Sequence, residues 1–271
     1  MKKNLIMTAA IGFQVSQLQF FIKSLRKYYK EDVCVIIGSK DNKIEEELLK
    51  NDCICIKTNI DKRDIQLKRY KIFLEFLKNK NYNQILFCDS RDIYFQSNPF
   101  KFSYKGSINF FLEDKKIKDC RFNSEWFVKT YGQKTLDELS DKIISCGGTI
   151  LGHQNSIIKF LRLMIEELKK HKFKKRLKFI LTFRRDKGGR GSDQAHGNFI
   201  AHKKLIEDSF FYQNKSGPIA TVYHLEEINF NDENQLINSF KEPYAVVHQF
   251  DKRWDKFSSH VNILKKKLNI N

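Results

Sequence analysis

The stretch Ile85-Leu-Phe-Cys-Asp-Ser-Arg-Asp-Ile-Tyr-Phe-Gln96 carries the clearest signal of fold and function in the sequence. Its apolar start has the length and content of a buried strand, and it ends in two carboxylates, Asp89 and Asp92. Because open α/β sheets bind ligands beyond the carboxyl ends of their strands, we expect both side chains to lie in a binding crevice. Paired carboxylates repel each other unless a cation lies between them. The stretch therefore predicts a divalent metal ion beside a bound phosphate.

Apolar runs and helical patterns alternate on both sides of this stretch, which favours an α/β fold with a mostly parallel central sheet flanked by helices. The expected strands are residues 5–10, 33–37, 53–57, 84–88, 107–112, 143–151, 221–224 and 244–248. The expected helices are residues 15–29, 41–51, 65–78, 123–131 and 193–204, and one more that Asn155 or Ser156 caps. No clear linker divides the chain, so we expect one domain over residues 1–271 with a basic C-terminal tail from about residue 255.

The composition fits a globular protein. Of 271 residues, 41% are hydrophobic and 13% aromatic, while only 3 Pro and 12 Gly argue against long disordered linkers. No apolar run approaches the ~18 residues that span a bilayer, and the apolar part of the N-terminus is too short for a signal peptide. The 6 Cys include no C-x-x-C pair, which argues against a zinc site and fits a reducing compartment. We expect a cytoplasmic protein, with the inner face of the membrane as an alternative location.

The net charge of +18 implies anionic partners or high solubility. Nucleic acid, anionic lipid surfaces and phosphorylated substrates are all compatible with it. Basic residues are densest at 169–178 and 265–267. Each cluster is either a solvated helix end or a surface patch for an anionic partner.

Two distant segments are expected to complete the crevice. His248 ends a late apolar strand; it is either a histidine satisfied by the backbone or the third ligand that a carboxylate-rich manganese site needs. Lys252 and Arg253 follow it and are expected to face a diphosphate. Gly147 and Gly148 lie inside a strand-like run, where glycines usually mark a close approach of backbone or ligand.

Asp193 and Gln194 follow the glycine-rich basic loop 184–192. At the start of a helix, Ser192 or Asp193 would be a good N-cap. The alternative is that the Asp193 and Gln194 side chains hydrogen-bond the hydroxyls of a sugar. Residues 188–191 are expected to form a mobile lid that closes on the substrate.

The order of these features resembles the retaining glycosyltransferases of family 8, the group that includes glycogenin and bacterial lipopolysaccharide galactosyltransferases. The resemblance extends from about Leu5 to Trp254, and the order of several weak motifs carries it. These motifs are Ala9–Ala10 after a short strand, Arg69–Tyr70 in a helix, Asp89–Asp92, Cys146–Gly148, Asp193–Gln194 with Asn198, and His248 with Trp254.

The resemblance implies a GT-A fold, a nucleotide-diphosphate sugar donor (first of all a UDP-sugar), and an Mn²⁺ or Mg²⁺ cofactor. The resemblance implies that Asp89, Asp92 and His248 bind the metal. Donor binding is expected from Ala9, Ala10, Arg69, Asp89, Ser90, Gly147, Gly148 and Lys252. Gln194 is expected to lie beneath the transferred sugar, and Asp193 is the candidate nucleophile if the reaction is a double displacement.

The chain departs from the family pattern at four places. The acidic motif Asp89-Ser-Arg-Asp92 is one residue longer than the family's Asp-x-Asp. Ser145-Cys146-Gly147 replaces Asn-Ala-Gly, and Ala195 replaces a second acid after the Asp-Gln pair. The segment from His248 to Trp254 is two residues shorter and lacks the usual glycine. We therefore expect a family 8-like relative.

The expected activity is a metal-dependent transfer of a hexose to a glycan or glycolipid acceptor, in bacterial surface polysaccharide or lipooligosaccharide synthesis. Trp254, Phe257 and Lys265–Lys267 are expected to contact an anionic membrane face. Two other classes remain open: a basic nucleic-acid-binding protein, argued from net charge alone, and a carboxylate-pair glycoside hydrolase. No nucleic acid is expected as a partner of the transferase.

Overall fold

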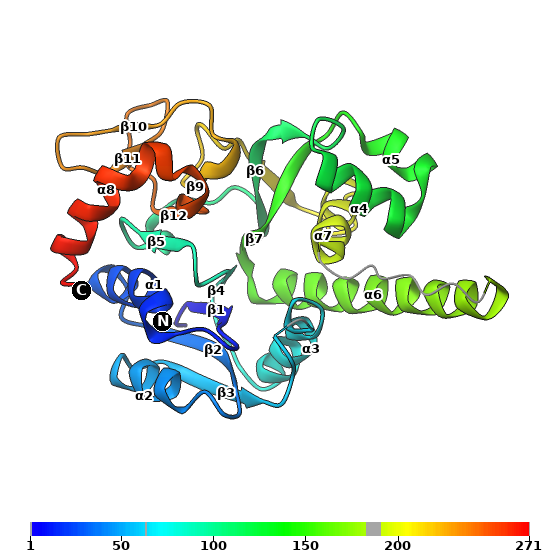
Figure 1. Ribbon diagram of the computed structural model, residues 1–271, viewed down its shortest axis with the longest axis horizontal. Helices are drawn as coiled ribbons and strands as arrows, with labels where there is room; N and C mark the ends of the chain where they lie inside the picture. Colours follow the sequence, from blue (N-terminus) through cyan, green and yellow to red (C-terminus); the bar gives the residue numbers. More distant parts are fainter. Residues whose placement is uncertain (1, 63, 183–190, 271) are drawn as a thin grey trace.

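A seven-stranded β-sheet forms the centre of the molecule (Figure 1). The computed structural model describes residues 2–62, 64–182 and 191–270, and for 174–182 it describes the backbone alone. The order of the strands in the sheet is β3-β2-β1-β4-β7-β6-β8. The strand bounds are β1 Leu5–Ala9, β2 Asp32–Gly38, β3 Ile54–Thr58, β4 Gln84–Cys88, β6 Ile108–Lys116, β7 Ile143–His153 and β8 Ser209–Tyr212.

The sheet is mostly parallel, which confirms the predicted α/β class. Strands β3, β2, β1 and β4 are parallel neighbours, and β6 pairs with β8 in parallel. Only β7 runs antiparallel to its two neighbours, β4 and β6. From β1 the chain adds β2 and then β3 on one side of β1, and it then crosses over to place β4 on the other side. The carboxyl ends of β1 and β4 therefore flank a topological switch point, where open α/β sheets bind ligands.

Helices cover both faces of the sheet. Successive side chains of a strand point to opposite faces, and in the buried strands both sets are apolar. In β2, Val33, Val35 and Ile37 pack toward α1 and α2, whereas Cys34 and Ile36 pack toward the opposite face. The helices of the first face are α1 Val15–Tyr28 and α2 Asn42–Lys50. Those of the second face are α3 Ile65–Leu77, α6 Gln154–Thr182 and α7 Ser192–His202.

Two smaller units flank this core. One joins α4 (Arg121–Tyr131) and α5 (Gln133–Leu139) to α7 through buried residues such as Phe127. The other is a three-stranded sheet in the order β5-β12-β9, packed against α8. The bounds of these elements are β5 Ile93–Phe95, β9 Ile219–Thr221, β12 Val246–His248 and α8 Trp254–Lys267. A two-stranded sheet of β10 Asn229–Phe230 and β11 Leu236–Ile237 and the 3₁₀ helices η2 Val222–His224 and η3 Phe250–Arg253 contribute residues to the apolar core of this unit. The 3₁₀ helix η1 Pro99–Lys101 follows β5, and its Phe100 packs against the core of the first face.

The C-terminal segment expected as a basic tail is the helix α8. Phe257 and Val261 recur at helical spacing and are buried, with exposed fractions of 0% and 1%, against the three-stranded sheet. Phe257 is therefore a core residue and not a membrane contact, whereas Trp254 is exposed. None of the helices within the described residues is long and apolar enough to cross a membrane.

Two further local predictions were wrong. Residues 222–224, expected as part of a strand, form the 3₁₀ helix η2. Helix α6 begins at Gln154, so Asn155 and Ser156 lie inside its first turn and neither is its cap. The Gln154 side chain is engaged with the preceding segment: its Oε1 accepts from the Tyr82 backbone N–H, and its Nε2 donates to the carbonyl of Lys80.

Candidate functional site

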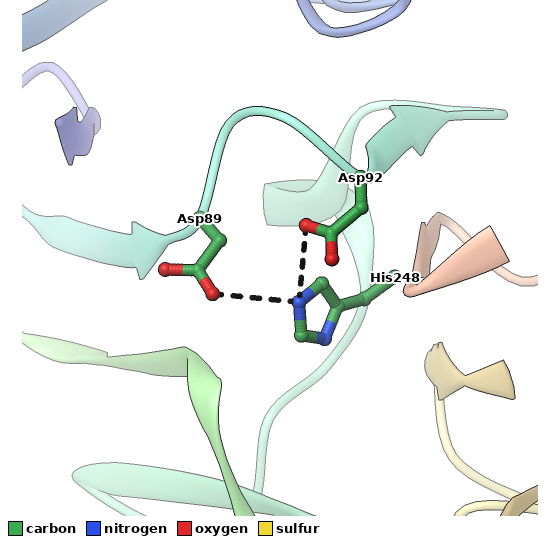
Figure 2. Close-up of side chains that lie close together, drawn as sticks. All are labelled: Asp89, Asp92 and His248. Carbon is green, nitrogen blue, oxygen red and sulfur yellow. Dashed lines mark ion pairs between the residues drawn. The ribbon is translucent and has the colours of Figure 1, made fainter. Parts of the chain in front are cut away.

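Asp89, Asp92 and His248 come together in one cluster (Figure 2). Nε2 of His248 lies 3.6 Å from Oδ2 of Asp89 and 3.7 Å from Oδ1 of Asp92. One ligand atom from each residue lies within 4.8 Å of the other two. The predicted meeting of the acid-ended strand with the late histidine is confirmed, and the binding of a metal there stays a prediction.

Strand pairing brings these segments together. Strand β4 delivers Asp89 at its carboxyl end, and a short link then carries Asp92 into β5. Strand β12 pairs antiparallel with β5, which places His248 opposite Ile93. The backbone N–H of Gln249 donates to the carbonyl of Asp92 at 2.7 Å. The histidine is thus fixed beside the acids by backbone hydrogen bonds.

Two glycines of β7 leave room for this arrangement. A Cβ added at Gly148 would lie 2.5 Å from Cε1 of His248 and 2.7 Å from Oδ2 of Asp89. A Cβ at Gly147 would lie 2.3 Å from Oε1 of Gln194. Side chains do not approach one another so closely, so the close approach predicted for these glycines is confirmed.

The donor set of the cluster fits a divalent cation. Nε2 of His248 is buried and has no hydrogen-bond partner among the described residues. Its Nδ1 lies 3.3 Å from Sγ of Cys146. If Nδ1–H donates to this sulfur, the lone pair of Nε2 faces the two carboxylates, and a cation would satisfy all three groups. Two carboxylate oxygens with one imidazole nitrogen suit Mn²⁺ and related ions, and a partner on the second ring nitrogen is typical of metal-ligating histidines.

The pKa values of the two carboxyl groups in the cluster shift in opposite directions. Burial disfavours the charge of Asp89, but His248 and Arg69 outweigh it and hold the pKa of Asp89 far below its usual range. Burial and the nearby charge of Asp89 raise the pKa of Asp92. Burial alone lowers the pKa of His248, but Cys146 and the two carboxylates outweigh it and raise that pKa. Two carboxylates that share a site behave in this way, and a further cation would favour the ionised form of both.

Arg69 links the cluster to α7. Its guanidinium lies 2.9 Å from Oδ1 of Asp89 and 3.4 Å from Oδ2 of Asp193. It also lies over the ring of Phe87, 4.7 Å from the centroid. The side chain of Arg69 is only 9% exposed. This buried cation therefore fixes two carboxylates that come from β4 and from the first turn of α7.

Gln194 is held against the glycine strand. Its Oε1 accepts from the backbone N–H of Gly147 at 2.8 Å, and its Nε2 donates to the carbonyl of Ser145 at 3.2 Å. Asn198, one turn later, also binds the backbone of Ser145, accepting from its N–H at 2.7 Å and donating to its carbonyl at 2.9 Å. The side chains of α7 thus take a fixed orientation beside the cluster.

The residue that caps α7 is Gly191, in the left-handed conformation with φ of 82°. Ser192 and Asp193, which the sequence favours as caps, lie inside the helix. A Cβ at Gly191 would lie 2.0 Å from the ring of Trp126, so this position also requires a glycine for space. The rest of the predicted lid, residues 188–190, lies outside the described residues.

Two cavities meet at the cluster, and both are lined by Gln66, Arg69 and Asp89. The larger, of about 550 Å³, lies over the ends of β1 and β4 and reaches Lys252. The smaller, of about 350 Å³, lies beside α4, β7 and α7. Both fall near or within the size range of small-molecule sites.

Some of the residues expected to bind the donor line the larger cavity, and others do not. Ala9 and Ser90 line the larger cavity, and Oγ of Ser90 donates to the carbonyl of Ala9 at 2.9 Å. Ala10 is fully buried, so its side chain is inaccessible to a ligand. Lys252 lines the larger cavity. Arg253 is engaged elsewhere, because it donates to the carbonyl of Leu225 at 3.0 Å and lies 3.5 Å from Asp255.

Sequence reasoning missed the acid of the smaller cavity, Glu113. It is 5% exposed, and burial raises its pKa to about 7, although His224 opposes this shift. The signal was present, because Ile108-Asn-Phe-Phe-Leu-Glu113 is a largely apolar run followed by a carboxylate, like the run before Asp89. Trp126 and Tyr223, which line the same cavity, were also missed, and no motif marks them.

Neither a scan against models of protein families nor a search of curated proteins finds a significant match to this chain.

Proposed function

We propose that the protein is a metal-dependent glycosyltransferase of the GT-A type, which moves a sugar from a nucleotide-diphosphate donor to a glycan hydroxyl. The observation that carries this proposal is the Asp89–Asp92–His248 cluster at the junction of two cavities. A nucleotide sugar also has two parts joined at a charged centre: its diphosphate, which needs a cation, links a nucleoside to a sugar. The larger cavity would take the nucleoside and the smaller one the sugar.

The residues of the cluster have distinct tasks in this proposal. Asp89, Asp92 and His248 would hold Mn²⁺ or Mg²⁺. When bound, the ion neutralises the charge that builds on the departing diphosphate. Arg69 orients Asp89, and Lys252 at the rim offers an ammonium group to the phosphate oxygens.

The transfer breaks the bond between the anomeric carbon and the diphosphate and forms one to the acceptor oxygen. In the retaining front-face reaction that the family resemblance implies, the acceptor proton passes to an oxygen of the departing phosphate. Gln194 would lie beneath the sugar, in the orientation that Gly147 fixes. Asp193 is the alternative nucleophile for a double displacement, and its carboxylate faces Arg69.

The acceptor is proposed to be a bacterial surface glycan on a lipid carrier. The net charge of +18 and the basic residues in the last turn of α8, Lys265–Lys267, favour contact with an anionic membrane face. Of the aromatic residues expected at that face, only the exposed Trp254 remains available.

Hydrolysis of a panel of nucleotide sugars without acceptor, each with Mn²⁺ or with EDTA, tests the proposed activity. We expect slow, metal-dependent release of the nucleotide from one donor. Release of sugar from simple glycosides without metal would instead support the glycoside hydrolase. Steeply salt-dependent binding to nucleic acid, with no response to any donor, would support the nucleic-acid-binding alternative.

A further inference from the structure

The smaller cavity has an aromatic wall that the chemistry at the cluster does not use. Phe122 and Trp126 of α4 stack with ring centroids 6.1 Å apart and an interplanar angle of 30°. Tyr223 of η2 lines the same cavity. Phe122 is 58% exposed and Tyr223 44% exposed, so part of this apolar surface faces solvent beside the site. Exposed aromatic surface at the mouth of a polar cavity is typical of a ligand-binding surface.

The same cavity contains a buried carboxylate that has no close donor among the residues that the structure describes. Oε1 of Glu113 lies 3.5 Å from Nε2 of Gln194, and Oε2 lies 3.6 Å from Nε2 of His224. Both distances are at or beyond the limit of an ordinary hydrogen bond. Burying a carboxylate without good donors is costly, and a hydroxyl group that enters the cavity would supply one.

The chemistry of this wall and this carboxylate suits a neutral polyol better than a cation. The raised pKa of Glu113, about 7, allows the carboxyl group to accept from one hydroxyl or to donate to another near neutral pH. Burial lowers the pKa of the neighbouring His224, so its neutral ring, which can donate to or accept from a hydroxyl group, is favoured there. A pyranose ring combines an apolar C–H face with hydroxyl donors and so matches both features.

We propose that Trp126, Tyr223 and Glu113 form a saccharide subsite for the acceptor, in which a pyranose ring packs on the aromatic side chains and one of its hydroxyls donates to Glu113. The name acceptor subsite rests on the proposed transferase activity, which places the donor sugar nearer the cluster. The binding of a saccharide to these three residues does not require that activity.

Intrinsic fluorescence tests the subsite directly, because the chain contains only 2 Trp, Trp126 and Trp254. The variant Trp254→Phe leaves Trp126 as the sole reporter. It is titrated with the methyl glycosides of galactose, glucose and N-acetylglucosamine, without nucleotide or metal. We expect a saturable change in emission with at least one glycoside, and no saturable change in Trp126→Phe.

Further variants are made in the Trp254→Phe background. Glu113→Gln should weaken the binding of the glycoside about tenfold, because a neutral acceptor replaces a charged one. Tyr223→Ala, at a half-exposed position, should also weaken the binding of the glycoside. This variant tests the subsite if Glu113→Gln does not fold. Phe240→Ala is the matched control, since Phe240 is 69% exposed and lies outside the residues that line both cavities. It should retain the affinity of the background.

The proposal is overturned if none of the three glycosides changes the emission, or if choline chloride gives the saturable change instead. Equal affinities in Glu113→Gln, Tyr223→Ala and the background would also overturn it. Failure of the transferase activity is a separate result. It would appear as no metal-dependent response to any nucleotide sugar while the glycosides still bind.

Discussion

Nε2 of His248 lies 3.7 Å from Oδ1 of Asp92, although the two residues are far apart in the sequence. The pairing of β12 with β5 creates this proximity, and Gly148 on the neighbouring β7 leaves the space for it. The geometry of the cluster therefore depends on residues outside the proposed metal-ligand set. This dependence allows the cluster to be tested without changing any of the three proposed metal ligands.

Gly148→Ala should abolish Mn²⁺ binding. The new Cβ would lie 2.5 Å from His248 and would displace the imidazole or β7 itself. Overpacking of this kind typically costs about 1–3 kcal/mol of unfolding free energy. Urea denaturation and Mn²⁺ titration by electron paramagnetic resonance measure the two effects.

The matched control is Gly197→Ala in α7, where an added Cβ has no atom within 4 Å among those described. Because alanine favours the helix over glycine, this variant should be stabilised by up to about 1 kcal/mol and should bind Mn²⁺ normally. Normal Mn²⁺ binding by Gly148→Ala would contradict the geometry described for the cluster.

Arg69→Met should destabilise the protein by about 1–3 kcal/mol, because it removes the buried cation that Asp89 and Asp193 share. Solvent screens part of the loss, since the Asp89 side chain is 40% exposed. The loss should shrink at about pH 5 relative to pH 7.5. Without Arg69 the pKa of both carboxyl groups would rise, and the native state would take up protons that relieve the repulsion. Urea denaturation at both pH values measures the difference. Arg121→Met, in an exposed ion pair, is the control and should change little at either pH.

Cys146→Ala should weaken Mn²⁺ binding about tenfold, because it removes the group that faces Nδ1 of His248. Cys146→Ser should retain most of the affinity, since a hydroxyl can accept from Nδ1–H in place of the thiol. Competition titration with a metal indicator compares the variants. Equal affinities of Cys146→Ala and the parent protein would show that Cys146 does not orient the imidazole. Cys55→Ala, on β3, controls for the loss of a thiol.

His260 should make stability pH-dependent. Burial, with a smaller contribution from Lys267, lowers the pKa of His260 to about 4. Its Nδ1 accepts from Asn234, and its Nε2 lies 2.7 Å from the hydroxyl of Tyr94, an arrangement that suits the neutral ring. Between about pH 6.5 and pH 4 the unfolded chain binds a proton that the native state does not, so stability falls as the pH falls through this window.

The contribution of His260 amounts to at most about 3 kcal/mol at neutral pH. His260→Gln should therefore lose less stability than the parent protein when urea denaturation is repeated between pH 7 and pH 5. Identical slopes for the two proteins would show that the pKa of His260 is the same in the native and the unfolded state, which would contradict the lowered native pKa.

Local sequence patterns predicted the main elements well where one face of an element is buried. Strand β4 was expected at residues 84–88 and lies there, because its apolar run has no competing helical period. The prediction was weaker in the second half of the chain. Strand β8 was missed, and α8 was interpreted as a tail because its three lysines obscured the apolar spacing of Phe257 and Val261.

The cluster could be predicted because a carboxylate-rich metal site needs a further ligand from a distant segment, and the family resemblance assigns that ligand to His248. The sheet that supplies this ligand was not predicted, because β12 pairs with β5 outside the seven-stranded sheet. The smaller cavity could not be predicted in this way. Its wall combines α4, η2 and β6, and the contacts among Trp126, Tyr223 and Glu113 arise only from tertiary packing. Of these three residues, Glu113 alone carried a sequence signal, because it follows an apolar run.

The most direct test of the central claim is thermal unfolding with UDP-sugars and Mn²⁺, added singly and together. We expect a large rise in Tm only when both are present, because the ion and the diphosphate would bind the native state jointly. Asp92→Asn should abolish this rise, whereas Asp232→Asn, at an exposed turn between β10 and β11, should preserve it. A nucleotide-sugar shift that needs no metal, or one that survives in Asp92→Asn, would contradict the assignment of Asp89, Asp92 and His248 as the metal site of a glycosyltransferase.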